Sequence, residues 1–289
     1  MATSPGIPAR CALDWFTCRI VSGMASLDKP TTRESALKSI VDFASDIQSG
    51  DQRIVAKAAS LVEDYDLLVS ELKPILGEPK KFPPIIGITG SPGVGKSTTT
   101  NALINLIRKD NASVAIVAID PSSAITGGAL LGDRIRLANH FSDKKVFIRS
   151  LATRGALGGL SNATDSVVFL LAVAGFDIVI IETVGVGQSE IEVMRHADTV
   201  MVVLAPGMGD GIQAAKAGVM EIGDVYLINK EDRGGAEEVA REVERSLALS
   251  AKDPNWKPPV LIGSMENESG ASAVLEAIES HLNYRHSKI

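Results

Sequence analysis

Hydrophobic and polar positions follow two different patterns along this 289-residue chain, and the pattern changes near residue 84. Between residues 31 and 76, apolar residues recur every three or four positions, as they do on the buried face of a helix. They are Ala36, Ile40, Phe43, Ala44 and Ile47 before the break Ser49-Gly50-Asp51, and Ile54, Ala58, Leu61, Val62, Tyr65 and Leu68 after it. This pattern predicts two packed helices. The stretch KPILGEPKKFPP then ends them and serves as a linker, so that residues 31–83 form an N-terminal helical segment.

From residue 84 to residue 289, short apolar runs alternate with longer helical patterns. The runs are IIGIT (85–89), SVAIVAID (113–120), KVFIRS (145–150), FDIVIIET (176–183), DTVMVVLA (198–205), DVYLINK (224–230) and PPVLIG (258–263). Strands that are apolar on both faces are typical of parallel sheets. Helices are expected at about 96–109, 161–174, 188–196, 211–221, 234–250 and 270–284. The fold class is therefore α/β, with a doubly wound, mostly parallel sheet.

Residues 1–30 show neither of these hydrophobic patterns. Helix formation there is opposed by Pro5, Gly6, Pro8 and Gly23, so we expect a disordered or irregular tail. The formal net charge is −6 and no basic cluster is present, which argues against a nucleic-acid partner. No apolar run approaches the ~20 residues of a membrane span. Cys11 and Cys18 match no common zinc spacing and predict free thiols in a reducing compartment. We expect a cytoplasmic protein, or one of the mitochondrial matrix if the source is eukaryotic.

The stretch GSPGVGKS (90–97), between a predicted strand and a predicted helix, fits the phosphate-binding pattern G-x-x-x-x-G-K-[ST]. Glycines allow successive backbone N–H groups to point at one anion, and the helix dipole adds positive potential. Lys96 is expected to reach the β- and γ-phosphates, and the Ser97 hydroxyl to bind Mg²⁺. This motif predicts a nucleotide triphosphatase and leaves the base open.

The base is indicated by Asn229-Lys230-Glu231-Asp232, which follows a predicted strand and fits N-K-x-D. A carboxylate at the fourth position can accept hydrogen bonds from N1–H and the exocyclic amine of guanine. Adenine has no matching pair of donors and would leave the carboxylate unpaired. The sequence therefore favours GTP over ATP.

Two carboxylates, Asp120 and Glu182, end predicted strands. At the carboxyl ends of neighbouring parallel strands they can hold Mg²⁺ or its water ligands. The N–H of Gly185 would then sense the γ-phosphate. Three glycine-rich loops at 122–134, 152–159 and 184–190 are long for connections in a compact domain and are interpreted as switches. Within them Asp133 is a further metal-ligand candidate, Arg154 a candidate for binding phosphate or a partner, and Gln188 a candidate for orienting the attacking water.

Several longer strings resemble the MeaB/MMAA (ArgK-type) family of P-loop GTPases, which act as G-protein chaperones of adenosylcobalamin-dependent acyl-CoA mutases. The strings are GSPGVGKST, AIDPSSAITGGALLGDRIRL, IRSLATRGALGG, AGFDIVIIETVGVGQSE, LAPGMGDGIQAAKAGVMEIGD and NKEDRGGA. The resemblance implies a SIMIBI-type G domain that uses GTP and Mg²⁺ to gate cofactor loading and protection of a mutase, above all methylmalonyl-CoA mutase. It also implies a homodimer where the family's C-terminal helical arm is present.

The motifs and the resemblance together predict that the nucleotide is bound by Gly90, Ser91, Pro92, Gly93, Val94, Gly95, Lys96, Ser97, Thr98, Gly185, Asn229, Lys230 and Asp232. The metal ligands would be Ser97, Asp120, Asp133 and Glu182, and the catalytic groups Lys96, Asp120, Glu182 and Gln188. A further switch around Asp210 and Lys216 would communicate with the mutase. Two alternatives stay open: a GTPase that delivers nickel, and a transport-associated ATPase or kinase.

Overall fold

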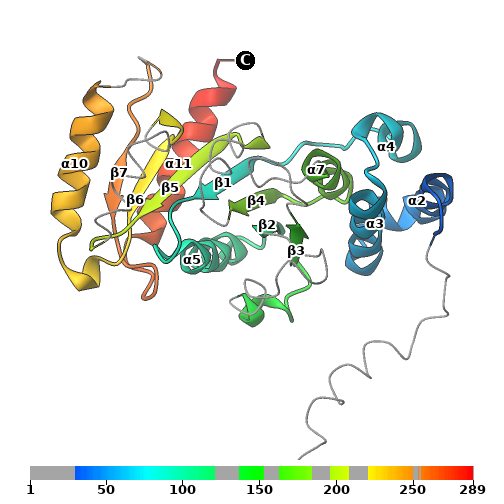
Figure 1. Cartoon of the computed structure of the whole chain (residues 1–289), viewed down its shortest axis with the longest axis horizontal. Helices are drawn as coiled ribbons and strands as arrows, with labels where there is room; N and C mark the ends of the chain where they lie inside the picture. The colour runs from blue at the N-terminus through cyan, green and yellow to red at the C-terminus, as the bar shows by residue number, and fades with distance from the viewer. Residues whose placement is uncertain are drawn as a thin grey trace, which may run out of the picture.

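The computed structural model describes residues 30–120, 137–152, 163–183, 196–207, 221–249, 253 and 255–288. Within them, seven parallel strands form one sheet in the order β3-β2-β4-β1-β5-β6-β7 (Figure 1). The strands are β1 Ile85–Thr89, β2 Val114–Asp120, β3 Val146–Ala152, β4 Ile178–Thr183, β5 Thr199–Leu204, β6 Val225–Ile228 and β7 Val260–Ile262. Each lies within a predicted apolar run or at most two residues beyond it, so the predicted α/β fold is confirmed.

The strand order inserts β4 between β1 and β2. Glu182, near the end of β4, pairs in register with Ile88 of β1 on one side and Ala118 of β2 on the other. The carboxyl ends of β1, β2 and β4 therefore meet at one edge of the sheet. The chain leaves β1 toward β2 and later returns to place β5 on the other side of β1, which is the switch point where α/β sheets bind ligands.

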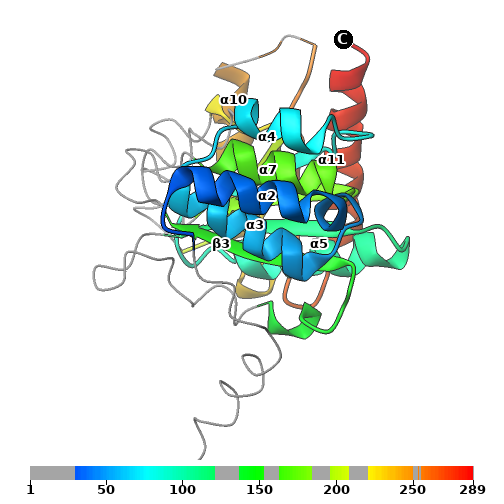
Figure 2. The same ribbon diagram turned by 90° about the vertical axis from the view of Figure 1, so that its right-hand side faces the viewer.

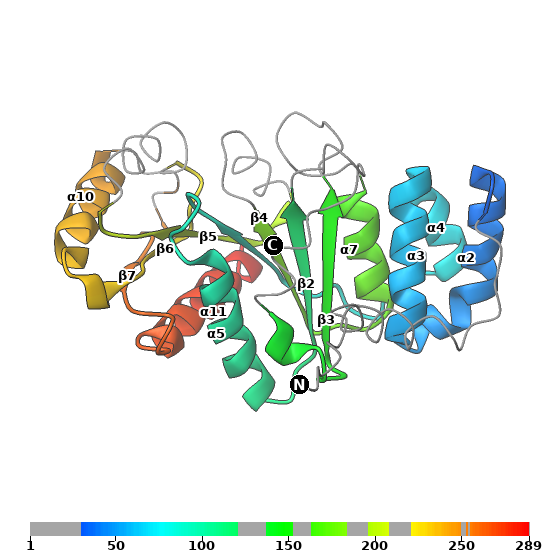
Figure 3. The same cartoon turned by 60° about the horizontal axis from the view of Figure 1, so that its bottom comes forward.

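Helices cover both faces of the sheet (Figure 3). Helices α5 (Lys96–Lys109) and α11 (Ala271–His286) share a buried apolar cluster with Ile180 and other residues of one face. On the opposite face, α7 (Thr164–Val173) packs against Val179 and Ile181, and α10 (Ala236–Leu249) packs against β5 and β6. Adjacent residues of β4 thus enter different clusters, because side chains alternate along a strand. Burial on both sides explains why the strands read as continuous apolar runs.

The N-terminal segment contains three helices where the sequence predicted two: α2 Arg33–Gln48, α3 Gln52–Tyr65 and α4 Val69–Leu76. Asp66 adopts a left-handed conformation with φ of 48° and ends α3, and Leu68 begins a new helix with its N–H bound to the Glu71 carboxylate at 2.8 Å. Leu68, predicted on the buried face of the second helix, is 52% exposed. Pro74 lies inside α4, so the proline-rich linker begins later than the sequence indicated.

Helices α2, α3 and α4 form a layer outside α7, beside the edge strand β3 (Figure 2). Ala36, Ile40 and Ile47 of α2 and Ala58 and Val62 of α3 are fully buried. They belong to the same apolar cluster as α7 and one face of the sheet, so the helical segment and the sheet share a continuous core. Within the described ranges, no helix combines the length and the apolar character needed to cross a membrane.

Candidate nucleotide-binding site

The loop between β1 and α5 occupies the carboxyl edge of the sheet. Gly95 has φ of 101°, and a Cβ there would lie 2.2 Å from Nδ2 of Asn229, so only glycine fits. Helix α5 begins at Lys96 without a side-chain cap, and the first turn of a helix is where backbone N–H groups can bind an anion. The Lys96 ammonium is buried and donates to the carbonyl oxygens of Gly90 at 2.8 Å and Ser91 at 3.2 Å. The loop therefore has the elements of a phosphate cradle.

The carboxylate of Glu182 is 4% exposed and is bound by two hydroxyl groups of α5. Ser97 Oγ donates to Oε1 at 2.6 Å, and Thr100 Oγ1 donates to Oε2 at 2.7 Å. Thr100 is fully buried, and the sequence did not single it out. The sequence feature that could have identified Thr100 is its position one helical turn after Lys96, on the side of α5 that faces the sheet. Ordinary core residues occupy such positions too, so the position alone does not mark a site residue.

These oxygens suit a hard divalent cation. Hydroxyl and carboxylate oxygens are the protein ligands that Mg²⁺ prefers, and Ser97 and Glu182 bring one of each together in a buried place beside the phosphate loop. Asp120 ends β2, the neighbour of β4, so the prediction that Asp120 and Glu182 lie on adjacent strands is confirmed at the level of the backbone. Among the described residues, no three His, Cys, Asp or Glu side chains gather into a metal-binding group.

The N-K-x-D motif contacts the phosphate loop directly. Asn229 is 3% exposed; its Nδ2 donates to the Val94 carbonyl at 2.9 Å, and its Oδ1 accepts from the Met265 N–H at 2.9 Å. Lys230, in a left-handed conformation, donates to the Gly93 carbonyl. Residues some 135 positions apart thus form one surface at the carboxyl edge of the sheet.

Asp232 lies in the short helix η3 (Glu231–Arg233), with an exposed carboxylate that accepts from Ser264 Oγ at 2.6 Å. This hydroxyl hydrogen bond lowers the pKa of Asp232, so the group stays an ionised acceptor. The sequence did not single out Ser264 or Met265. They could have been found by the rule that identified Asn229, because they follow β7 at the same edge of the sheet.

The other predicted phosphate-loop residues lie in the described part of the chain. Val94 is buried, and Pro92, Gly93 and Thr98 are exposed. Six predicted site residues lie outside the described part of the chain: Asp133, Arg154, Gly185, Gln188, Asp210 and Lys216. The glycine-rich loops at 122–134 and 184–190 and most of the loop at 152–159 lie outside it as well.

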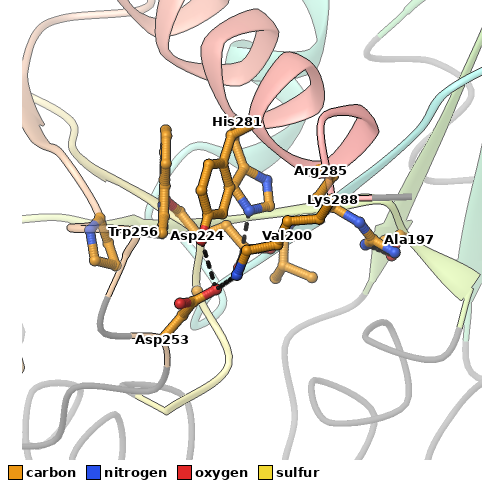
Figure 4. A pocket seen from close by; sticks show the side chains of 11 residues that line it. Ala197, Val200, Asp224, Asp253, Trp256, His281, Arg285 and Lys288 are labelled. Carbon is orange, nitrogen blue, oxygen red and sulfur yellow. Dashed lines mark hydrogen bonds and ion pairs between the residues drawn. The ribbon is translucent and has the colours of Figure 1, made fainter.

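A pocket of about 380 Å³ opens at the opposite, amino edge of the sheet, between the starts of β5 and β6 and helix α11 (Figure 4). Its polar groups bind one another: Asp224 accepts from the Val200 N–H at 2.9 Å, and Lys288 donates to Asp253 at 2.7 Å. The Lys288 ammonium lowers the pKa of Asp253 to about 2. These contacts hold α11 and the Trp256 segment against the sheet, away from the phosphate loop.

Comparison with known proteins identifies the family. Residues 56–288 match the family model described as methylmalonyl Co-A mutase-associated GTPase MeaB. The chain belongs to this family. It is accordingly a GTPase of the MeaB family, as the phosphate loop and the N-K-x-D motif predicted.

The relatives agree with this assignment. A protein of Pyrococcus horikoshii is 42% identical over 245 residues, which make up 82% of this chain and 76% of the relative. The methylmalonic aciduria type A homolog, mitochondrial, of Caenorhabditis briggsae is 40% identical over 199 residues, 67% of this chain and 48% of that protein. A solved structure of an LAO/AO transport system kinase superposes with a TM-score of 0.66 at 27% identity, covering 91% of this chain and 79% of the other.

Proposed function

We propose that this MeaB-family GTPase binds Mg²⁺ and GTP at the carboxyl edge of the sheet and uses hydrolysis to gate cofactor loading and protection of a cobalamin-dependent acyl-CoA mutase. The proposed client is methylmalonyl-CoA mutase. The observation that carries the nucleotide part is the contact of Asn229 with the phosphate loop, since it puts the base-reading and phosphate-binding residues on one surface. The family's description and the relative from Caenorhabditis briggsae support the mutase part.

In this proposal, each nucleotide-site residue that the structure describes has a specific role in binding. The loop residues 90–98 surround the phosphates with backbone N–H groups, and phosphate oxygens replace the Gly90 and Ser91 carbonyls as acceptors for Lys96. Asp232 accepts from N1–H and the exocyclic amine of guanine, while Ser264 keeps its carboxylate oriented. Asn229 and Lys230 fix the distance between the base and the phosphates.

Ser97 and Glu182 would hold the magnesium ion, with Asp120 and Asp133 as further proposed ligands. When bound, the ion neutralises charge on the phosphates as the bond to the γ-phosphate breaks. Thr100 keeps one Glu182 oxygen engaged and so fixes the direction in which the other oxygen points. Lys96 stabilises the same charge from the other side of the loop.

The remaining predicted residues are assigned to switching. Gly185 would sense the γ-phosphate, Gln188 would orient the attacking water, and Arg154, Asp210 and Lys216 would report the nucleotide state to the mutase. A change that γ-phosphate imposes on such residues biases a two-state element and thereby alters the affinity for a partner. We further propose that the active form can be a homodimer.

Two measurements test the proposal in sequence. Competition between GTP and ATP for the purified chain should show a strong preference for GTP. Addition of methylmalonyl-CoA mutase should then raise the rate of GTP turnover, because switch GTPases are slow alone. An unchanged rate, together with unchanged mutase activity, would reject the chaperone role and leave GTP binding intact. Displacement of GTP by ATP would instead favour the kinase activity named for the solved relative.

A further inference from the structure

Glu63 of α3 is a buried carboxylate that lies outside the nucleotide site. Its Oε2 accepts from Arg149 of β3 at 2.7 Å, and its Oε1 accepts from the backbone N–H of Ala152 at 3.1 Å. The side chains of Glu63 and Arg149 are only 9% and 14% exposed. One carboxylate thus joins the N-terminal helical layer both to a side chain and to the backbone of the sheet.

The Ala152 N–H lies at the carboxyl edge of the sheet, next to the end of β2. Ala152 is the last residue of the edge strand β3 and pairs in register with Asp120, the last residue of β2. Since strands lie about 4.8 Å apart, the end of β3 is about 10 Å, or two strand spacings, from β4. Glu182 of β4 is in register with Ala118, two residues before Asp120. The carboxylate takes the place of a neighbouring strand for this N–H and holds the end of β3 beside the proposed metal ligands.

Stability does not account for this ion pair. Burial removes both charges from water, and apolar residues of similar volume would serve a core equally well or better. Arg149 also has a buried Nε that has no hydrogen-bond partner among the described residues, while its NH1 donates to Ser60 Oγ at 3.0 Å. The guanidinium is therefore oriented toward α3 with one donor unsatisfied. What the pair provides is a fixed position for the end of β3.

We infer that Glu63 is a positioning residue: its hydrogen bond to the Ala152 N–H fixes the carboxyl end of β3 and couples the N-terminal helices to the nucleotide state of the site. The inference rests on the proposed function, because it takes the end of β2 to lie at the γ-phosphate and its metal ion. Loss of the contact should therefore weaken binding of GTP more than binding of GDP. By linkage, GTP should in turn strengthen the contact between α3 and β3.

The substitution Glu63→Gln tests this with little change in volume. An amide offers one acceptor oxygen and turns its NH₂ group toward the second donor. The charged guanidinium of Arg149 is the stronger donor and retains the oxygen, so the Ala152 N–H loses its partner. Glu71→Gln is the matched control in the same layer. The Glu71 carboxylate also binds one arginine, Arg33, and one backbone N–H, that of Leu68, but both partners belong to the helical layer.

We expect Glu63→Gln to lower the affinity for a non-hydrolysable GTP analogue by about fivefold or more, with GDP affinity changed less than about twofold. Glu71→Gln should leave both affinities within that twofold range. An equal loss for both nucleotides, no loss, or the same shift in Glu71→Gln would overturn the inference. If the parent chain itself shows no preference for GTP over ATP, it is the proposed function that fails.

Hydrogen exchange in the unaltered chain covers the case in which Glu63→Gln does not fold. The Ala152 amide should exchange more slowly with the GTP analogue bound than with GDP bound, since the contact is tighter in the first state. Amides within α10, which packs against β5 and β6 away from β3, should exchange at the same rate in the GTP-bound and GDP-bound states. Equal protection of Ala152 in the two states would also overturn the inference.

Discussion

Ser97 and Thr100, one turn apart on α5, each donate a hydroxyl hydrogen bond to a different oxygen of Glu182, at 2.6 Å and 2.7 Å. The two bonds join α5, the helix that follows the phosphate loop, to β4, the strand that follows α7, across more than 80 residues of sequence. They orient a carboxylate that is only 4% exposed. The site is thereby held in a fixed arrangement before any ligand arrives.

Replacing Thr100 by valine should reduce GTP turnover by about 10–100-fold, as losses of supporting hydrogen bonds around metal ligands do. Valine has nearly the same shape but leaves Glu182 Oε2 without its hydroxyl donor. It should also lower the free energy of unfolding by about 1–3 kcal/mol, because a buried acceptor loses one hydrogen-bond donor. Turnover at saturating Mg²⁺ and urea unfolding measure the two effects. Thr100→Ser keeps the hydroxyl and should restore most of the activity; equal loss in both variants would contradict the role.

Asp232→Asn should change the base that the site accepts. The carboxylate that reads two guanine donors becomes an amide with one acceptor and one donor, which matches N1–H and the C2 carbonyl of xanthine. We expect GTP affinity to fall by about 10²-fold or more and XTP affinity to rise above it. Competition binding with GTP, XTP and ATP measures this. The exposed neighbour Glu231 provides the control Glu231→Gln, which should bind as the parent does, and GTP affinity retained in Asp232→Asn would contradict the assignment.

Gly95→Ala should separate the phosphate loop from the N-K-x-D motif. The new methyl group would lie 2.2 Å from Asn229 Nδ2, so the Asn229 bond to Val94 must break or shift. GTP affinity should fall by about tenfold or more, beyond the roughly 1–2 kcal/mol of stability that positive φ costs an alanine. Gly77→Ala is the control, since Gly77 also has positive φ (+73°) but has nothing within 4 Å of the new Cβ. It should lose stability and keep its GTP affinity.

Acid should weaken the fold through His140 before the carboxylates titrate. Burial lowers the pKa of His140 below 6.5, although the Asp143 carboxylate raises it in part, and Nε2 lies 2.8 Å from Asn101 Oδ1. Above about pH 6.5 the histidine is neutral in both states, whereas below it the unfolded chain binds the proton first. The free energy of unfolding should therefore fall as the pH drops from 6.5 through the folded pKa.

His140→Gln should show a smaller fall than the parent chain when urea unfolding is compared between about pH 8 and about pH 5.5. His286→Gln, at an exposed position, should retain the pH dependence of the parent. The same slope in His140→Gln as in the parent would show that another group is responsible.

The sequence by itself determined the strands, the parallel sheet and the phosphate loop. These depend on local pattern: a strand buried on both faces must be apolar throughout, and a backbone that wraps an anion needs glycine. Asn229 and Asp232 were predictable for the same reason, because the base motif is short and directly follows a strand. The third N-terminal helix was not predicted, for two reasons. Leu68 continues the apolar spacing of α3, and Pro74 is a residue typical of a linker.

Only the tertiary structure decided which of these pieces meet. The strand order places β4 between β1 and β2 and so brings Glu182 to Ser97 and Thr100, and it brings Ser264, two residues after the end of β7, to Asp232. The contact of Glu63 with Ala152 likewise depends on how α3 packs against the edge of β3. Such contacts join residues 30 to 90 positions apart, and their partners are ordinary hydroxyls, amides and carboxylates. No local pattern marks them, since packing of the whole core fixes their distances.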